Sequence, residues 1–297
     1  MTERHLFVTG GAGCVGHYLL DRLLEDPRNR LHVLLRNPGK LRTDLRERVR
    51  VVPGDLAEPE GFLPMLSEMD GAVLAAASWG GQEARQVNVL TTWAILDALD
   101  PARCKRVVYF STASLLDPGG NVLDAAGEHG TGYIRQKHEA LEGISGTRTG
   151  DRVVTVFPTV VLGGGDRHPW SHASRGLREF RRYLWLLRFL RMDARFHVVQ
   201  ADYLARAVVF LLEGQMPSRP VVLGEPPLTV GEALRHLASE QGLRPVPQLD
   251  ITPLALLLPH LLPWKFTTWD RYCLLHRDFT YPVFDLDKEI ACVPSPS

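Results

Sequence analysis

The sequence predicts an α/β fold: a doubly wound parallel sheet followed by a smaller, mostly helical C-terminal region. Two observations predict it. Short apolar runs alternate with amphipathic segments through the first half of the 297 residues, and the first apolar run ends in a glycine-rich turn before a helical pattern. Apolar strands that alternate with helices form parallel sheets covered on both faces, and right-handed crossovers make the sheet doubly wound.

The predicted elements follow one another in a regular order. Strands are expected at 5–10, 31–37, 49–56, 71–78, 105–112 and 152–158, and helices at 15–26, at 86–99 and around residue 133. A late strand is expected in "PVVLGE" and a helix in "TVGEALRHLASEQGL" after it. Apolar runs of this length bounded by turn residues are typical of buried strands.

Composition and charge exclude several classes of protein. Lys+Arg and Asp+Glu are equal at 34 each, so the net charge does not point to nucleic acid. The four cysteines are scattered without metal-ligand spacing, which predicts reduced thiols and no metal site. The chain begins directly with a strand, with no signal peptide and no apolar run that could span a bilayer, so we expect a cytoplasmic protein.

The turn after the first strand has the spacing of a dinucleotide-binding loop. In "TGGAGCVG", Gly10, Gly13 and Gly16 lie three residues apart, between a strand and a helix. Glycines at these positions permit the tight turn, the approach of backbone to a pyrophosphate and close packing of helix on strand. The helix N-terminus offers unpaired N–H groups to the phosphates. The expected cofactor-binding residues of this loop are Gly10, Gly11, Gly13, Cys14, Val15 and Gly16.

The residue after the second strand predicts which dinucleotide binds. Arg36 lies 20 residues after Gly16 (36 − 16 = 20), about where an acidic residue holds the ribose of NAD. Arginine instead suits a 2′-phosphate, and Lys40 and Arg42 add positive charge nearby. NADP(H) is therefore the expected cofactor, with NAD as the alternative.

A tyrosine and a lysine share one face of a later helical stretch. "TGYIRQK" places Tyr133 and Lys137 at positions i and i+4. The spacing alone allows either a surface pair or a phenol whose proton is managed by an ammonium group.

The order of these motifs resembles the short-chain dehydrogenase/reductase superfamily, in its extended, epimerase-like branch with a Rossmann fold. "GDL" at 54–56 resembles the segment that meets the adenine, "AAAS" at 75–78 the small residues behind the cofactor, "FST" at 110–112 the strand end with the catalytic Ser/Thr, and Tyr133 and Lys137 the YxxxK pair. The segment "FPTVVLGGG" resembles the one beside the nicotinamide, with Phe157 where an arginine is usual. The resemblance implies further cofactor contacts from Asp55, Leu56, Ala75, Ala76, Lys137, Pro158, Val160 and Val161.

The resemblance also implies a mechanism. Tyr133 would exchange a proton with the substrate oxygen while hydride moves at the nicotinamide, and Lys137 would lower the pKa of Tyr133 and hold the ribose. Thr112 would position the substrate oxygen, with Ser114 as the second choice and Ser111 nearby. The implied catalytic residues are therefore Tyr133, Lys137 and Thr112.

Three functions remain open. The first is an NADP(H)-dependent oxidoreductase that interconverts a secondary alcohol and a ketone. The second is a nucleotide-sugar epimerase or related isomerase with a tightly held nicotinamide; the residues after Thr112 lack the acidic pair of dehydratases and the Tyr-Gly pair common in epimerases. The third is a non-catalytic cofactor sensor, against which the retained Tyr133 argues.

The chain is expected to divide by function. Residues 1–162 should form the dinucleotide-binding domain, with a late return around 200–224, and residues 163–199 and 225–297 the substrate-binding region. In that region, "SRGLREFRRYLWLLRFLRM" reads as one amphipathic helix with its apolar face on the core, and "ITPLALLLPHLLPWKF" as core. Their apolar and basic character favours a lipophilic small-molecule substrate. Arginine contacts to an anionic substrate group, contact of this region with a membrane surface, and a homodimer stay open.

Overall fold

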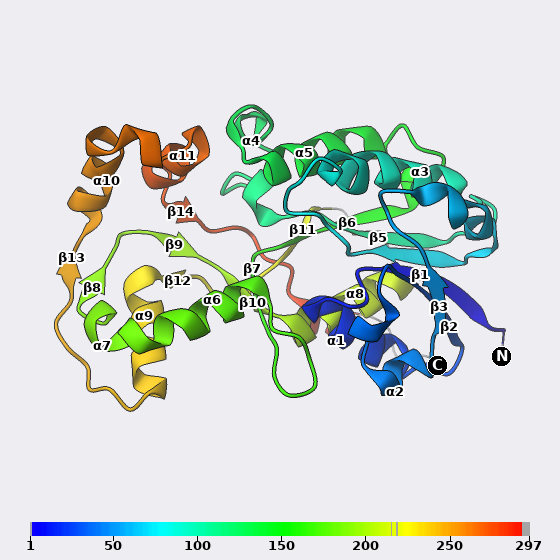
Figure 1. The fold of residues 1–297 in the computed structure, drawn as a ribbon, viewed down its shortest axis with the longest axis horizontal. Coiled ribbons are helices and arrows are strands. Elements are labelled where there is room, and N and C mark those ends of the chain that lie inside the picture. The colour runs from blue at the N-terminus through cyan, green and yellow to red at the C-terminus, as the bar shows by residue number, and fades with distance from the viewer. Residues whose placement is uncertain (1, 215, 218, 293–297) are drawn as a thin grey trace.

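A parallel sheet of seven strands forms the centre of the molecule, a computed structural model that describes residues 2–214, 216–217 and 219–292 (Figure 1). The strand order is β11-β6-β5-β4-β1-β2-β3. The strands are β1 (Arg4–Thr9), β2 (Asn29–Leu35), β3 (Arg50–Pro53), β4 (Gly71–Leu74), β5 (Arg106–Phe110), β6 (Val153–Pro158) and β11 (Val221–Leu223). The order reverses between β1 and β4, and ligands bind at such a switch point.

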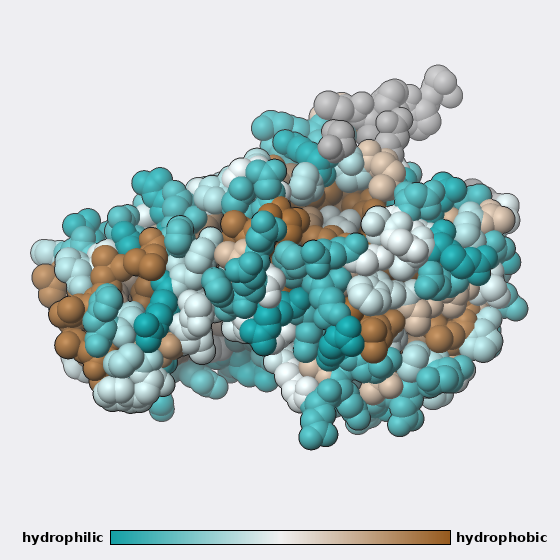
Figure 2. Space-filling model, turned by 90° about the horizontal axis from the view of Figure 1, so that it is seen from above, coloured by the Kyte–Doolittle hydropathy of each residue, from teal (hydrophilic) through white to brown (hydrophobic). Residues whose placement is uncertain are grey.

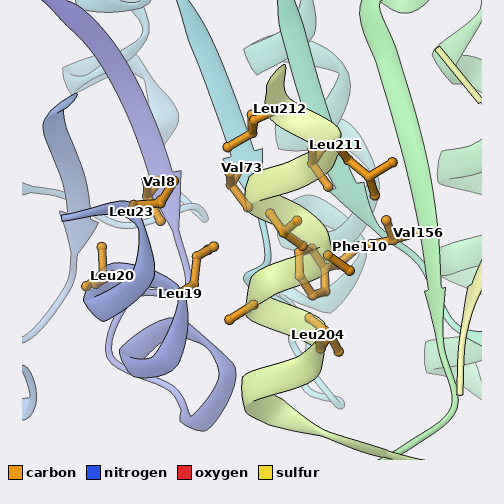
Figure 3. Close-up of a cluster of buried hydrophobic side chains, with 14 of the residues drawn as sticks. Val8, Leu19, Leu20, Leu23, Val73, Phe110, Val156, Leu204, Leu211 and Leu212 are labelled. Carbon is orange, nitrogen blue, oxygen red and sulfur yellow. The ribbon is translucent and has the colours of Figure 1, made fainter. Parts of the chain in front are cut away.

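Helices cover both faces of this sheet, because successive strand residues point to opposite sides. Val8 packs in one core cluster and its neighbour Phe7 in the other. The first face is covered by α1 (Cys14–Leu23) and α8 (Ala201–Glu213), whose leucines meet Val73, Phe110 and Val156 of the strands (Figure 3). The second face is covered by α3 (Thr91–Ala98) and α5 (Gly132–Ile144). The doubly wound α/β prediction is confirmed.

Two short helices, α2 (Thr43–Arg46) and α4 (Asp124–His129), connect elements of this layer. The remaining chain forms a second, smaller body beside the sheet (Figure 1). Its helices are α6 (His172–Phe180), α7 (Leu184–Leu187), α9 (Val230–Glu240), α10 (Thr252–Leu261) and α11 (Thr268–Leu275). Capping boxes begin α9 (Thr229 with Glu232) and α11 (Thr267 with Asp270). The last helix is α12 (Leu286–Cys292).

Short strand pairs tie this body together. They are β7 (Val160–Leu162) with β10 (Val198–Gln200), β8 (Leu190–Arg191) with β13 (Leu249–Asp250), and β9 (Arg195–Phe196) with β12 (Leu228–Thr229) and β14 (Asp278–Phe279). After β14 the chain returns to the sheet, where Phe284 and Leu286 are buried against the α1–α8 core. Residues 293–297, part of the predicted substrate region, lie outside the described residues. No helix in the described part of the chain is long and apolar enough to cross a membrane.

Several predicted elements differ from the structure. The strand expected at 71–78 ends at Leu74, and the helix expected at 86–99 begins with a π-helical turn at Gln86–Leu90. The expected single helix over residues 174–192 is wrong: α6 ends at Phe180, a 3₁₀ turn follows, and α7 ends at Leu187. Its expected apolar face is divided too, since Leu184 is buried whereas Phe180 is exposed.

The expectation that residues 251–266 form core is also wrong. Helix α10 presents Leu254, Leu257 and Leu261 to solvent, and Trp264 after it is exposed. The positions i, i+3 and i+7 share one helical face, so α10 has an apolar side that no other described element covers.

Candidate active site

The glycine loop has the geometry that a bound pyrophosphate requires. Gly10 adopts φ +78°, and a Cβ there would lie 2.8 Å from the backbone of Ala75 and Ala76. A Cβ on Gly16 would lie 2.1 Å from the Gly10 carbonyl oxygen. Helix α1 begins at Cys14 with no side-chain cap on Gly13, and its first intrahelical bond is from His17 N to Gly13 O. The N–H groups of the first turn are thus free to bind an anion.

Arg36 and Asp55 lie side by side beyond β2 and β3. The Arg36 guanidinium is 3.5 Å from the Asp55 carboxylate and is largely exposed, while Asp55 also accepts a hydrogen bond from Ala57 N. Lys40 lines the same cleft. The expected contribution of Arg42 is wrong, because its guanidinium is engaged by Asp21 and Asp44 and it does not line the cleft.

The segment after β4 is held by a buried amide. Asn88 accepts a hydrogen bond from Ser78 N and donates to Ser78 O, at 2.8 and 2.7 Å, and it donates to Gln136 Oε1 of α5 at 2.7 Å. Asn88 is 1% exposed. This one side chain therefore fixes the "AAAS" loop relative to the helix that carries Tyr133 and Lys137.

Lys137 is fully buried and turned toward the end of β5. Its Nζ donates to the carbonyl oxygen of Phe110 at 2.7 Å and to the Tyr109 hydroxyl at 3.3 Å. Burial lowers the pKa of Lys137 to about 7. An ammonium group has three donors, so one N–H beyond these two bonds can serve a ligand.

Tyr133 lies in the first turn of α5, after the Thr131 cap. Burial raises the pKa of Tyr133 to about 12. The expected lowering of this pKa by Lys137 is not present in the structure, because the lysine is directed to Phe110 and Tyr109 instead. The Tyr133 phenol is consequently protonated at neutral pH.

The end of β5 supplies two hydroxyl groups of different kinds. Thr112 Oγ1 accepts a hydrogen bond from Ser114 N at 3.3 Å, which leaves the threonine O–H free to donate. Ser111 is 5% exposed, and its Oγ has no hydrogen-bond partner among the described residues. A buried hydroxyl group without a hydrogen-bond partner destabilises the folded state. The Ser111 hydroxyl can therefore be stabilised by a hydrogen bond to a polar group of a ligand.

Trp79, which the sequence interpretation missed, covers Tyr133. The two rings stack with centroids 4.2 Å apart and an angle of 24°, and the ring of His172 of α6 lies 5.3 Å from that of Trp79. Trp79 directly follows the "AAAS" segment. Its position directly after a segment that the sequence assigned to the cofactor could have identified Trp79 as a site residue.

All predicted site residues line one cleft of about 2020 Å³. This holds for Gly10, Gly11, Gly13, Cys14, Val15, Gly16, Arg36, Asp55, Leu56, Ala75, Ala76, Thr112, Tyr133, Lys137, Pro158, Val160 and Val161. Their assigned roles stay predictions. The second body contributes aromatic side chains to the same cleft, among them Trp170, Phe196, Trp269 and Phe279.

The cleft is also lined by three further side chains with polar groups, His197, Cys14 and Arg175. His197 is buried, with Nδ1 2.6 Å from Glu225 O and Nε2 accepting from Tyr281 N, so both ring nitrogens are engaged. Burial raises the pKa of Cys14 to about 11, consistent with a packed thiol. Arg175 lines the cleft and has no ion pair among the described residues.

The loop between β7 and α6 is fastened to α1. His168 stacks on Tyr18 at 3.7 Å, and its Nε2 is 2.9 Å from Asp21 Oδ2. His168 is therefore engaged by two residues of α1. No group of three His, Cys, Asp or Glu residues able to hold a metal is found in the part of the chain that the structure describes.

The residues present fit a nicotinamide dinucleotide. The glycine cradle would be filled by a Cβ, the first turn of α1 has free N–H groups, and Ser111 Oγ is buried without a partner. Together with the sheet order, these features define a dinucleotide-dependent protein of the extended short-chain dehydrogenase/reductase type.

The family follows from the sequence. The model of the family described as "NAD dependent epimerase/dehydratase family" matches residues 6–224, and the chain belongs to this family. The predicted resemblance is confirmed, as is the class of NAD(P)-dependent enzyme at the level of the family. The family does not decide between NADP and NAD.

Solved structures share the fold over nearly the whole chain. The structure titled "Crystal structure of gox2253" is 19% identical, covering 99% of this chain and 94% of that one with a TM-score of 0.71. The terminal R domain from the myxalamid PKS-NRPS biosynthetic pathway is 20% identical over 93% and 80% of the two chains, with a TM-score of 0.70. UDP-glucuronic acid 4-epimerase from Bacillus cereus, solved with UDP-glucuronic acid and NAD, is 17% identical over 83% and 85%, with a TM-score of 0.61.

Curated relatives match shorter stretches. Quinone oxidoreductase 2 of Escherichia coli is 24% identical over 123 residues, which are 41% of this chain and 40% of that protein. Trichosetin synthetase PKS-NRPS1 of Gibberella fujikuroi is 42% identical over 62 residues, 20% of this chain and 2% of that protein. The chain therefore spans less than half the length of these relatives.

Proposed function

We propose that this protein is an NADP(H)-dependent oxidoreductase that interconverts a secondary alcohol and a ketone on a hydrophobic substrate. One observation carries the proposal: Tyr133, Lys137 and Thr112 line the same cleft as the glycine loop, and several aromatic side chains line that cleft too. Trp79, Trp170 and Trp269 suit an apolar molecule better than the many hydroxyl groups of a sugar.

The chain's own residues would divide the work at the substrate oxygen. Tyr133, protonated at neutral pH, donates its proton to the carbonyl oxygen in reduction and takes it back in oxidation. Thr112 donates a hydrogen bond to the same oxygen and fixes its approach. When bound, the nicotinamide supplies or accepts the hydride.

Other residues would hold the dinucleotide. The first turn of α1 binds the pyrophosphate, and Asp55 and Leu56 border the adenine. Lys137, which has one N–H beyond its bonds to Phe110 and Tyr109, would bind the ribose. The unpaired Ser111 hydroxyl would offer a further polar contact to the bound nucleotide. Arg36 and Lys40, both on the cleft, favour a 2′-phosphate and thus NADP(H).

Consumption of NADPH with a panel of hydrophobic ketones tests the proposal. Tyr133→Phe should lower kcat by about 100- to 10,000-fold while NADPH binding stays unchanged. Tyr183→Phe is the matched control, because Tyr183 lies outside the cleft and should leave kcat as it is. Equal turnover by Tyr133→Phe and the wild-type protein would sink the catalytic assignment.

The isomerase alternative is favoured by one residue. Arg175 lines the cleft without a carboxylate partner among the described residues. Its guanidinium could bind the diphosphate group of a nucleotide sugar. Protein purified with tightly held nicotinamide, and with no net consumption of added NADPH, would support this alternative over the oxidoreductase.

A further inference from the structure

Tyr281 brings to the cleft a hydroxyl group that no step of the proposed function uses. It lies in the return segment, which we define as residues 280–284, between β14 and the buried Phe284 at the sheet. The Tyr281 side chain lines the cleft. Its phenol oxygen makes no hydrogen bond with any described residue, and unlike the Ser111 hydroxyl it is not among the atoms buried without a partner. This hydroxyl is therefore available to a ligand.

The structure holds Tyr281 at its backbone and at its ring. The Tyr281 N–H donates to His197 Nε2 at 3.0 Å, and the two rings stack with centroids 5.9 Å apart. Because Nε2 accepts this bond, the proton of the neutral imidazole is on Nδ1, which donates to the Glu225 carbonyl oxygen at 2.6 Å. Three residues after Tyr281, Phe284 N donates to Val222 O at 2.8 Å. A side chain fixed in this way binds a ligand without a large ordering cost.

One buried cluster connects Tyr281 with the end of β5. The Tyr281 side chain packs against the cluster formed by Ala113, Leu116, Phe157 and Val222. Ala113 directly follows Thr112 and begins the 3₁₀ turn that the Thr112 side chain caps. The turn that carries Thr112 and the return segment are therefore joined through this cluster.

Helix α11 connects Tyr281 with Tyr133. Burial raises the pKa of Tyr281, and the nearby thiol of Cys273 raises it further, so the phenol is protonated at neutral pH and can donate. Cys273 and Tyr133 pack against the same buried cluster around Trp269. Tyr281, Cys273 and Tyr133 all line the cleft, so α11 links the two phenols along its wall.

The outer apolar side of the second body does not take part in this wall. Figure 2 shows hydrophobic side chains gathered at the end of the second body farthest from the sheet, where Figure 1 places α10. The exposed Leu254, Leu257 and Trp264 do not line the cleft. The contacts that the second body offers to a ligand in the cleft come instead from residues such as Tyr281 and Phe279.

The reacting oxygen of the substrate has no place for a third donor. A carbonyl oxygen accepts through two lone pairs, and the proposed function assigns one to Tyr133 and the other to Thr112. The Tyr281 hydroxyl is thus left for a different acceptor atom. Because Phe279 and Trp269 line the same cleft, a neutral oxygen suits this place better than a charged group.

We propose that Tyr281 donates a hydrogen bond to a second, non-reacting oxygen of the substrate. The enzyme would thereby select hydrophobic ketones that carry a further carbonyl or hydroxyl group, because a site with a buried donor disfavours an analogue that leaves the donor unpaired. Tyr281 is then a specificity-determining residue that takes no part in proton transfer. This inference rests on the proposed function and names the substrate class of the same cleft.

Matched pairs of ketones test the inference. Each pair combines a keto ester (benzyl pyruvate, benzyl acetoacetate or benzyl levulinate) with the keto ether in which a methylene group replaces the ester carbonyl. The three esters differ in the spacing between the two carbonyl groups. We expect the wild-type protein to bind the keto ester of at least one spacing about tenfold more tightly than its keto ether. Tryptophan fluorescence measures these affinities in the presence of NADP⁺, which cannot reduce a ketone, because Trp79 and Trp269 line the cleft.

Tyr281→Phe should remove this preference. In NADPH turnover, KM for the preferred keto ester should rise about tenfold with kcat unchanged, because the lost hydrogen bond is made equally in the ground state and the transition state. KM for the keto ether should stay the same. Tyr272→Phe is the matched control, since Tyr272 of α11 does not line the cleft. The unfolding temperature of each variant verifies that it is folded.

Two outcomes would overturn the role of Tyr281. One is an equal affinity of the wild-type protein for keto ester and keto ether in all three pairs, and the other is an undiminished preference in Tyr281→Phe. The fluorescence titration separates this role from the proposed function. A preference that depends on Tyr281 without any consumption of NADPH would contradict the oxidoreductase alone, whereas turnover without the preference would contradict the role of Tyr281 alone.

Discussion

Trp79 stacks on Tyr133, the residue that we propose as the proton donor. The indole covers one face of the phenol, with centroids 4.2 Å apart, and excludes water from it. Burial disfavours a phenolate, so the cover contributes to the raised pKa of Tyr133. The same indole lines the cleft, so we expect it to affect both proton transfer and substrate binding.

Trp79→Ala should consequently change the pH profile. Uncovering Tyr133 lowers its pKa from about 12 toward its ordinary value near 10, so the alkaline limit of ketone reduction should move about one pH unit lower. The kcat/KM for bulky apolar ketones should fall about tenfold. Trp79→Phe keeps a stacking ring and serves as control; an identical pH profile in Trp79→Ala and wild type would contradict the assignment.

Lys137 makes the stability of the cofactor-free protein depend on pH. Its pKa is about 7 in the folded protein and 10.5 when unfolded, so between these values the unfolded chain binds more protons and stability rises with pH. From pH 6 to pH 9 the free energy of unfolding should increase by about 2 kcal/mol more in the wild-type protein than in Lys137→Met. Urea unfolding at both pH values measures this, and parallel changes in the two proteins would show that burial does not depress the lysine.

The segment after β2 is the element that we expect to discriminate between NADP and NAD. Arg36 is largely exposed and only 3.5 Å from Asp55. A surface pair of this kind is weak, so the guanidinium is available to a phosphate. Arg42, by contrast, is already engaged by two carboxylates.

Arg36→Ala should therefore weaken NADPH binding by about 10- to 100-fold and leave NADH binding nearly unchanged. Fluorescence titration with both nucleotides measures the ratio. Arg42→Ala is a useful comparison, because it should reduce stability without changing this ratio. A loss of affinity for both nucleotides in Arg36→Ala would place the arginine elsewhere than at the 2′-phosphate.

The strands and helices of the sheet could be predicted, because the local sequence pattern determines where each of them forms. Gly16 is required by its contact with the Gly10 carbonyl oxygen within one strand–turn–helix unit. Buried strands such as β5 are recognisable as apolar runs in the sequence. The interruptions of the helices in the second body could not be predicted in this way. Residues 174–192 have a helical period throughout, yet the chain leaves the helix after Phe180 so that β8 can pair with β13, sixty residues away in sequence. The direction of the Lys137 side chain likewise depends on Phe110 and Tyr109, which no spacing rule joins to it.

At the scale of the whole molecule, the cleft lies between two bodies that are fastened on its cofactor side. His168, in the loop before α6, stacks on Tyr18 of α1. Within the sheet body, Arg22 of α1 donates three hydrogen bonds of 2.8–3.0 Å to Asp202 of α8. A dinucleotide bound along α1 would contact the sheet edge and the loop of the second body at once. Binding should thus stabilise the molecule as a unit.

Saturating NADPH should raise the unfolding temperature in one cooperative transition. At 100 times Kd the gain is about 2.7 kcal/mol, which for a chain of this size corresponds to about 5–10 °C. Differential scanning calorimetry measures both the shift and the number of transitions. A second transition that NADPH leaves in place would mean that the two bodies unfold separately.

Asn88 has a consequence for how such a molecule can change its substrate. The side-chain amide of Asn88 links Ser78, ten residues earlier in the sequence, to Gln136, forty-eight residues later. Asn88 is not among the residues that line the cleft, so we expect neither the dinucleotide nor the substrate to contact it. The position of Trp79 relative to Tyr133 is therefore held by the buried Asn88 side chain and not by a residue that lines the cleft. We expect that the aromatic residues which the second body contributes to the cleft, such as Trp170 and Trp269, can be exchanged in a redesign without disturbing these hydrogen bonds of Asn88.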